Sequence, residues 1–181
     1  MFPNAPFLDC YCLCYISLSV AKTITTALIT SRLDYCNSLL YNIASKGILK
    51  FQCVLNCLAR VVTRSPRFSH SVPLLKSLHW LPVQSRIIFK LCTIAYQTLS
   101  SGEPWYLFSM LSLAPKAREL RSSGFHVLSV PRVKTHDGTP AFSVAVTTIW
   151  NSIPEPVKLS NSIVSFHHHL KTHLFRLAFP S

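Results

Sequence analysis

The sequence has few acidic residues and few glycines. Six Asp and Glu stand against 18 Lys and Arg, which gives a formal net charge of +12 at pH 7. Charged residues make up only 13% of the chain, whereas about 25% is ordinary for a soluble domain. Four glycines exclude a glycine-rich phosphate-binding architecture or a flexible array. The positive mean hydropathy of +0.33 excludes disorder driven by composition.

Disulfide and membrane architectures are also not expected. The seven cysteines are an odd number, which disfavours a closed disulfide framework. The apolar stretch 7–20 is similar to a signal-peptide core, but it lacks a basic region before it and Asp9 interrupts it. It is too short to cross a bilayer, which takes about 20 apolar residues. We therefore expect no membrane partner and reduced thiols in a cytosolic or nuclear protein.

Apolar periodicity predicts a mainly α fold. Residues 1–17 differ in character from the rest and form a divergent N-terminal segment, whereas 18–179 show helical periods. Apolar residues recur every three to five positions from residue 19 to Ile43, and Lys46-Gly47 is expected to break this first helix. A second helix, with its apolar stripe between Ile48 and Val62, would complete an antiparallel hairpin.

Further helices are expected along the rest of the chain. They cover 73–78, 83–99, 104–113, 140–150 and a C-terminal helix capped by Ser162, with its apolar stripe from Ile163 to Leu177. Pro131 makes the segment 125–133 an extended edge or loop. The expected fold is therefore an irregular helical bundle of about five to seven helices, with a short extended/β segment near 125–133.

The position of the charges suggests a polyanionic partner. No Asp or Glu occurs between Tyr35 and Gly102, so nothing in this stretch balances its cations. Such a stretch suits a sugar-phosphate backbone, although a basic solvated face without a partner is the alternative. The candidate nucleic-acid contacts are Lys46, Lys50, Arg60, Arg64, Arg67, Arg86 and Lys90.

Catalytic and metal sites find less support in the sequence. The six acids are scattered, which argues against a two-metal site. Two residue pairs lie one helical turn apart and could each supply two zinc ligands, namely Cys53 with Cys57 and His169 with His173. The alternative for the cysteines is that they only fill the core, as buried cysteines often do. The run His167–His169 cannot converge on one ion, since three consecutive residues spread widely around a helix, and a solvated face is expected. Asp34 is expected to pair with Arg32 or to cap the local backbone. We predict no catalytic residue, no metal and no cofactor.

The order of the motifs resembles a known family. The segment Thr30–Tyr41 (TSRLDYCNSLLY) resembles a signature of vertebrate non-LTR (LINE) retrotransposon polyproteins of the chicken-repeat-1 and L2-like kind, downstream of the reverse-transcriptase palm. Further blocks follow in the order that this family shows. They are Leu58–Arg64, Phe68–His70, Leu75–Val83 (LKSLHWLPV), Arg86–Ile87, Phe89–Lys90, Leu120–Ser123, Val130–Arg132, Ala141–Ala145, Trp150–Pro154 and Leu170–Phe175.

The resemblance implies the helical, thumb-like C-terminal portion of a reverse transcriptase. The family's polymerase uses an aspartate pair of the Tyr-x-Asp-Asp type, and no such pair exists here. The endonuclease and its acidic metal site are absent from the sequence as well. The expected function is therefore that of a catalytically inactive fragment with residual, non-specific binding of RNA or an RNA/DNA duplex. The alternative is a relic open reading frame with no biochemical activity.

Overall fold

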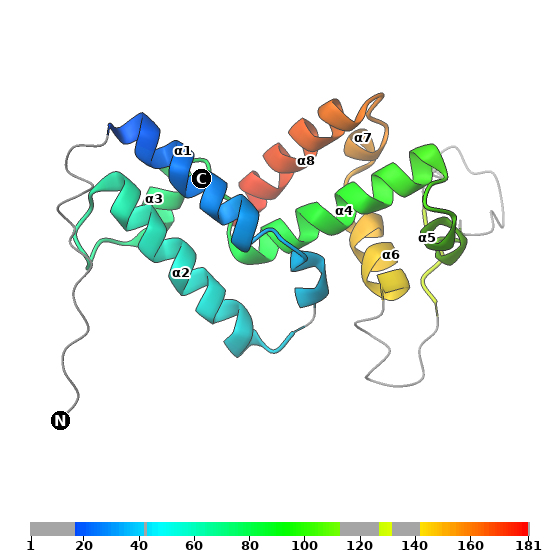
Figure 1. Cartoon of the computed structure of the whole chain (residues 1–181). Coiled ribbons are helices and arrows are strands. Elements are labelled where there is room, and N and C mark those ends of the chain that lie inside the picture. The colour runs from blue at the N-terminus through cyan, green and yellow to red at the C-terminus, as the bar shows by residue number, and fades with distance from the viewer. Residues whose placement is uncertain (1–16, 42, 113–126, 132–141, 181) are drawn as a thin grey trace.

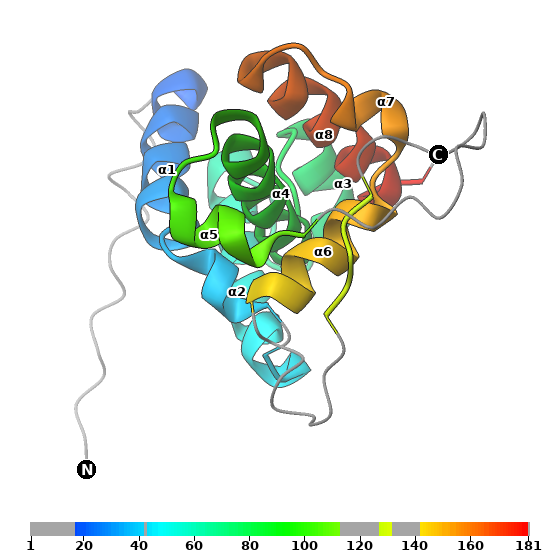
Figure 2. The ribbon, with the colours of Figure 1, turned by 90° about the vertical axis from the view of Figure 1, so that its right-hand side faces the viewer.

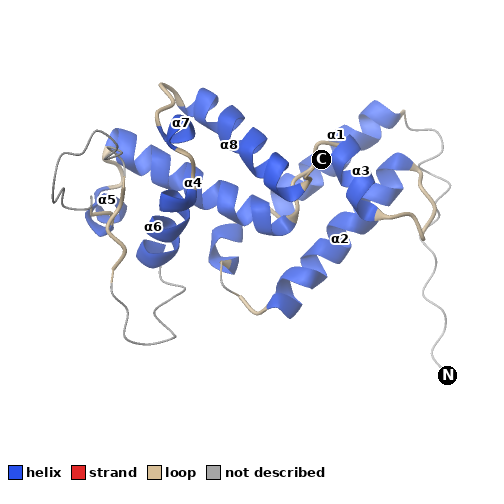
Figure 3. Ribbon diagram, turned by 180° about the vertical axis from the view of Figure 1, so that it is seen from behind, coloured by secondary structure: helices blue, strands red, loops and turns tan. Residues whose placement is uncertain are grey.

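The protein is described by a computed structural model covering residues 17–41, 43–112, 127–131 and 142–180. Within these residues the chain is mainly α, as the sequence predicts, and forms an irregular bundle (Figures 1 and 3). In chain order the elements are α1 (Leu18–Arg32), η2 (a 3₁₀ helix, Asn37–Leu40), α2 (Ser45–Thr63), α3 (Ser71–Ser77), α4 (Val83–Ser101), α5 (Trp105–Met110), α6 (Phe142–Ser152), α7 (Glu155–Lys158) and α8 (Ile163–Ala178).

Helix α4 is the central element of the bundle. It packs against α2, η2, α5, α6 and α8, and Figure 1 shows α2 toward one end of it and α5 toward the other. Its seven buried positions include Ile87, Leu91 and Ala95, which face these neighbours. The helix ends at Gly102, where φ is +73° and a side chain would be strained. This stop agrees with the sequence prediction.

The first helix is shorter than its apolar pattern predicts. Helix α1 ends at Arg32, and the N–H groups of Leu33 and Asp34 both donate to the Ile29 carbonyl. Cys36 then adopts a left-handed conformation with φ of 50°, which reverses the chain into η2. The prediction of one helix to Ile43 is therefore wrong, because the reversal lets η2 pack on α4.

The predicted break at Lys46-Gly47 is also wrong, because both residues lie inside the first turn of α2. Helices α1 and α2 still pack as the expected hairpin and run in opposite directions in Figure 1. The positions Leu55, Ala59 and Val62 form the buried face of α2.

A buried tryptophan fixes the turn between α3 and α4. His79 takes a left-handed conformation, and the Trp80 N–H donates to the Leu75 carbonyl. Each of the three tryptophans lies beside a proline or a helix end, which predicts that its ring is packed. Trp80 and Trp150 are buried. Trp105 is 75% exposed at the start of α5, so the prediction is wrong for this residue.

The residues 127–131 form an extended segment beside α6. The Asn151 side chain accepts from the Leu128 N–H at 2.9 Å and donates to the Leu128 carbonyl at 2.8 Å. The Ser129 N–H donates to the Ser112 carbonyl. These contacts hold the described part of the extended segment that is predicted near 125–133, and the rest of that segment lies outside the described residues. The predicted N-terminal segment 1–17 also lies outside them, apart from Ser17.

Helix α8 closes the core over α4 (Figure 2). Ser162 caps it by accepting from the Ser165 N–H, and Phe166, Leu170 and Leu174 are buried, as predicted. Leu177 is 67% exposed and does not belong to the buried stripe.

Candidate nucleic-acid interface

One face of α2 carries most of the predicted contacts. Successive members are three or four residues apart, so they fall in a single line along the helix. We call this line the α2 stripe. It consists of Lys46, Lys50, Cys53, Cys57, Arg60 and Arg64. The buried residues of α2 lie about half a turn away, so the stripe faces away from α1, α3 and α4.

Both ends of the α2 stripe are well defined. Lys46 and Lys50 are exposed in the first turns of the helix, and Arg64 is exposed at its C-terminal end with φ of 52°. The Arg60 side chain is half-buried, and its Nε donates to the Ser69 carbonyl at 3.1 Å. This bond ties the loop after α2 back to the helix, and Arg67 lies exposed in that loop.

The two cysteines of the stripe are exposed between the cations. The expectation that they fill the core is therefore wrong. The zinc alternative also lacks support in the described part of the chain, where no three His, Cys, Asp or Glu side chains gather as a metal site would need.

Arg86 and Lys90 do not lie on the α2 stripe. Both are on α4, which packs on the opposite face of α2, where the Gln52 side chain accepts from the Val83 N–H at 3.0 Å. The Arg86 guanidinium forms an ion pair with Asp34 at 2.9 Å and donates from Nε to the Leu81 carbonyl. Asp34 therefore pairs with Arg86 rather than with Arg32. The seven candidate contacts thus divide between two separate surfaces.

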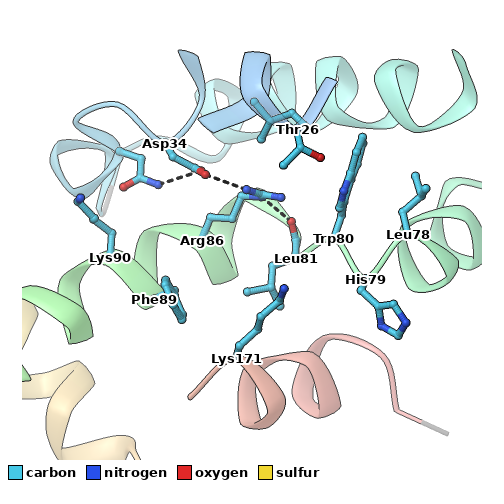
Figure 4. Close-up of a pocket in the computed structure, with 12 residues that line it drawn as sticks. Thr26, Asp34, Leu78, His79, Trp80, Leu81, Arg86, Phe89, Lys90 and Lys171 are labelled. Carbon is cyan, nitrogen blue, oxygen red and sulfur yellow. Dashed lines mark hydrogen bonds and ion pairs between the residues drawn. The ribbon is translucent and has the colours of Figure 1, made fainter. Parts of the chain in front are cut away.

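A pocket of about 490 Å³ lies beside the Asp34–Arg86 pair (Figure 4). It is formed by α1, η2, the turn before α4, α4 itself and α8. Its lining residues include the aromatic Trp80 and Phe89 and the basic Lys90 and Lys171. The sequence did not single out Lys171, because that residue lies 81 positions after Lys90 and no spacing links the two.

The histidine run of α8 is split between different environments. His168 and His169 are exposed, and Nδ1 of His169 lies 3.1 Å from the Ser160 hydroxyl. His167 instead packs against Phe89 and Phe166. Burial, and secondarily the charge of Lys90, lower its pKa. The three rings do not converge, as predicted, but only part of the run is a solvated face.

Two further ionisable groups are buried near the α4–α6 interface. Burial raises the pKa of the Cys92 thiol to about 12. Burial also lowers the pKa of Lys158, whose Nζ lies 5.9 Å from the Trp150 ring centroid. Neither group adjoins the α2 stripe, and both have the character of packed core residues.

Comparison of the chain with protein-family models, curated proteins and solved structures finds no match. Among the helices that the structure describes, none combines the length and the apolar character needed to cross a membrane.

Proposed function

We propose that the protein binds the sugar-phosphate backbone of RNA or of an RNA/DNA duplex without sequence preference, through the α2 stripe and Arg67. The observation that carries this proposal is the alignment of four cations on one outward face of α2. No acidic residue occurs on α2 or in the loop after it, so neither of these elements supplies a carboxylate to this face. Phosphate contacts of this kind position a duplex but do not read its sequence.

In this proposal the protein is a catalytically inactive fragment that resembles the region after the palm of a LINE-type reverse transcriptase. The scattered acids support the absence of catalysis, since phosphoryl transfer needs carboxylates that converge on metal ions. Binding alone is the activity that the remaining residues support.

The test is the salt dependence of binding to a fluorescently labelled single-stranded RNA. The variant Lys46→Glu/Lys50→Glu reverses two exposed cations of the stripe. We expect weaker binding and a plot of log affinity against log salt that is shallower by about 1.4, because each of the two lost phosphate contacts contributes about 0.7 to the slope. Arg176→Glu, which reverses one exposed cation on α8 away from α2, is the control.

Equal affinity at low and high salt in the parent protein would refute the proposal. An equal loss of affinity in the Arg176→Glu control would also refute it, since only net charge would then matter. Aggregation of the purified protein without cooperative unfolding would instead support the alternative of a relic open reading frame. The apolar side chains of Val20, Ile24 and Leu28 on α1 favour that alternative, because each is about half exposed.

A further inference from the structure

The pocket beside the Asp34–Arg86 pair has the features of a small-molecule site. Its volume of about 490 Å³ lies within the range of about 300–1,000 Å³ that is usual for such sites. It is distinct from the α2 stripe, because α4, which carries Arg86 and Lys90, packs on the other face of α2.

The charge around the pocket favours an anion. Within the described ranges of the chain, Arg86, Lys90 and Lys171 line it together with one carboxylate, Asp34, which Arg86 already neutralises. Among the described residues, the ammonium groups of Lys90 and Lys171 form no hydrogen bond or ion pair, and both side chains are exposed at the rim. They come from different helices, and Figure 4 shows them on different sides of the opening. Both are long, flexible side chains, so a phosphate group in the opening can draw the two ammonium groups toward it.

The walls of the pocket favour a planar ring. Trp80 and Phe89 line it together with Ile29, Leu78 and Leu81, so aromatic and aliphatic surface faces the same space as the cations. In Figure 4 Trp80 and Phe89 stand on opposite sides of that space. Bases stack on such side chains whatever their sequence. Inorganic phosphate alone would leave this apolar surface uncovered.

A buried acceptor in the lining requires a donor. Asn37 is 2% exposed and lines the pocket, and its Oδ1 has no hydrogen-bond partner within the part of the chain that the structure describes. Its Nδ2 donates to Asp34 at 3.5 Å, which fixes the amide orientation, since the reverse orientation would place two acceptors together. A buried acceptor without a donor is costly and uncommon. An N–H group on the edge of a bound ring would satisfy it.

We infer that this pocket binds a nucleotide, with its base between Trp80 and Phe89, its phosphate at Lys90 and Lys171, and an amino group of the base donating to Asn37. The ligand is either a free mononucleotide or one unpaired nucleotide of a strand, since both present the same chemistry. Bases with an exocyclic amino group, such as adenine, fit the Asn37 acceptor best.

The experiment is calorimetric titration of the full chain with AMP, adenosine and ribose 5-phosphate. We expect AMP to bind at least about tenfold more tightly than either fragment. The variant Lys90→Glu/Lys171→Glu should weaken AMP binding by at least about tenfold, whereas Arg176→Glu, also on α8, should not change it. Absence of AMP binding at about 1 mM, or equal AMP affinity in the parent and the double variant, would overturn the inference.

The role of Asn37 is best tested from the ligand, because a substitution at this buried position can disturb folding. Purine riboside 5′-phosphate, which has a hydrogen in place of the adenine amino group, should bind the parent protein several-fold more weakly than AMP. Equal affinity would refute the assigned contact with Asn37.

The source of the nucleotide is distinguished with a short oligoadenylate. If the double variant loses both oligoadenylate and AMP binding, the pocket accepts a nucleotide of a strand. If it loses only AMP binding, the ligand is a free nucleotide. The variant Lys46→Glu/Lys50→Glu should keep full AMP affinity, so a failure of the α2 stripe and a failure of the pocket give different results.

Discussion

Asp34 and Arg86, 52 residues apart in the chain, form an ion pair with 2.9 Å between Oδ2 and Nη1. The pair joins the turn after α1 to the first turns of α4, and both side chains are less than one-third exposed. It also places a negative charge near Arg86 and Lys90, two cations one turn apart that would otherwise repel each other.

Removing the carboxylate should destabilise the fold. Asp34→Ala takes the partner from Arg86 and the acceptor from the Asn37 amide, so we expect a loss of about 1–2 kcal/mol in the free energy of unfolding. Urea denaturation measures it. Glu103→Ala, at an exposed acid, should change stability by less than about 0.5 kcal/mol. Equal effects at the two sites would mean that the ion pair makes no contribution.

The aromatic centre of the core should be far more sensitive. Phe166 is fully buried, with its ring centroid 4.3 Å from that of Tyr96 and 6.0 Å from that of Trp150. Phe166→Ala should cost about 3–5 kcal/mol because it leaves a cavity among these rings. On the same helix, Val164→Ala at a 75% exposed site should be nearly neutral. Thermal melts provide the comparison. An equal decrease in the melting temperature of the two variants would contradict this packing.

His167 should make stability depend on mildly acidic pH. Its pKa is lowered by burial and by Lys90, so the folded state favours the neutral ring. The unfolded chain takes up the proton near pH 6.5, and stability is therefore lost as the pH falls below about 6.5. Replacing His167 with Gln should remove this part of the pH dependence, and His168→Gln at the exposed neighbour should leave it. Unfolding curves at a series of pH values provide the comparison.

Cys92 should resist alkylation in the native protein and weaken the fold at alkaline pH. Its thiol is buried with a pKa of about 12, whereas an ordinary thiol ionises near 9.0. Above about pH 9 the unfolded chain loses this proton while the folded chain retains it, so ionisation favours unfolding. The stability of the parent relative to Cys92→Ala should therefore decline from pH 9 upward. A constant difference would argue against a buried neutral thiol.

Local signals predicted most of the helices but not how they pack. The Ser162 cap and the Gly102 stop depend on neighbouring residues and were predictable. The reversal at Cys36 was not, because the apolar spacing continues through it and only the packing of η2 on α4 requires the turn. Trp105 is predicted to be packed because it lies beside Pro104 at the start of a helix, yet it is exposed.

The same limit applies to the candidate sites. Four predicted cations lie on one stripe because they share a helix, where spacing determines the face. The sequence does not show that Arg86 lies on a different surface from these four cations, because its partner Asp34 lies just outside the acid-free stretch and far from Arg86 in sequence. The pocket combines Asn37, Trp80 and Lys171 from three parts of the chain, and only tertiary structure brings these together.

The most direct test of the α2 stripe uses its own thiols. Cys53 and Cys57 are exposed between its cations, so bound RNA should cover them. Alkylation rates would be measured for each cysteine by peptide mass mapping, with and without excess single-stranded RNA. A Val164→Cys variant supplies an exposed control on α8. We predict that at low salt RNA slows alkylation at 53 and 57 by at least about fivefold but not at 164, and that high salt removes the protection. Unchanged rates at 53 and 57 in protein saturated with RNA would contradict the proposed interface.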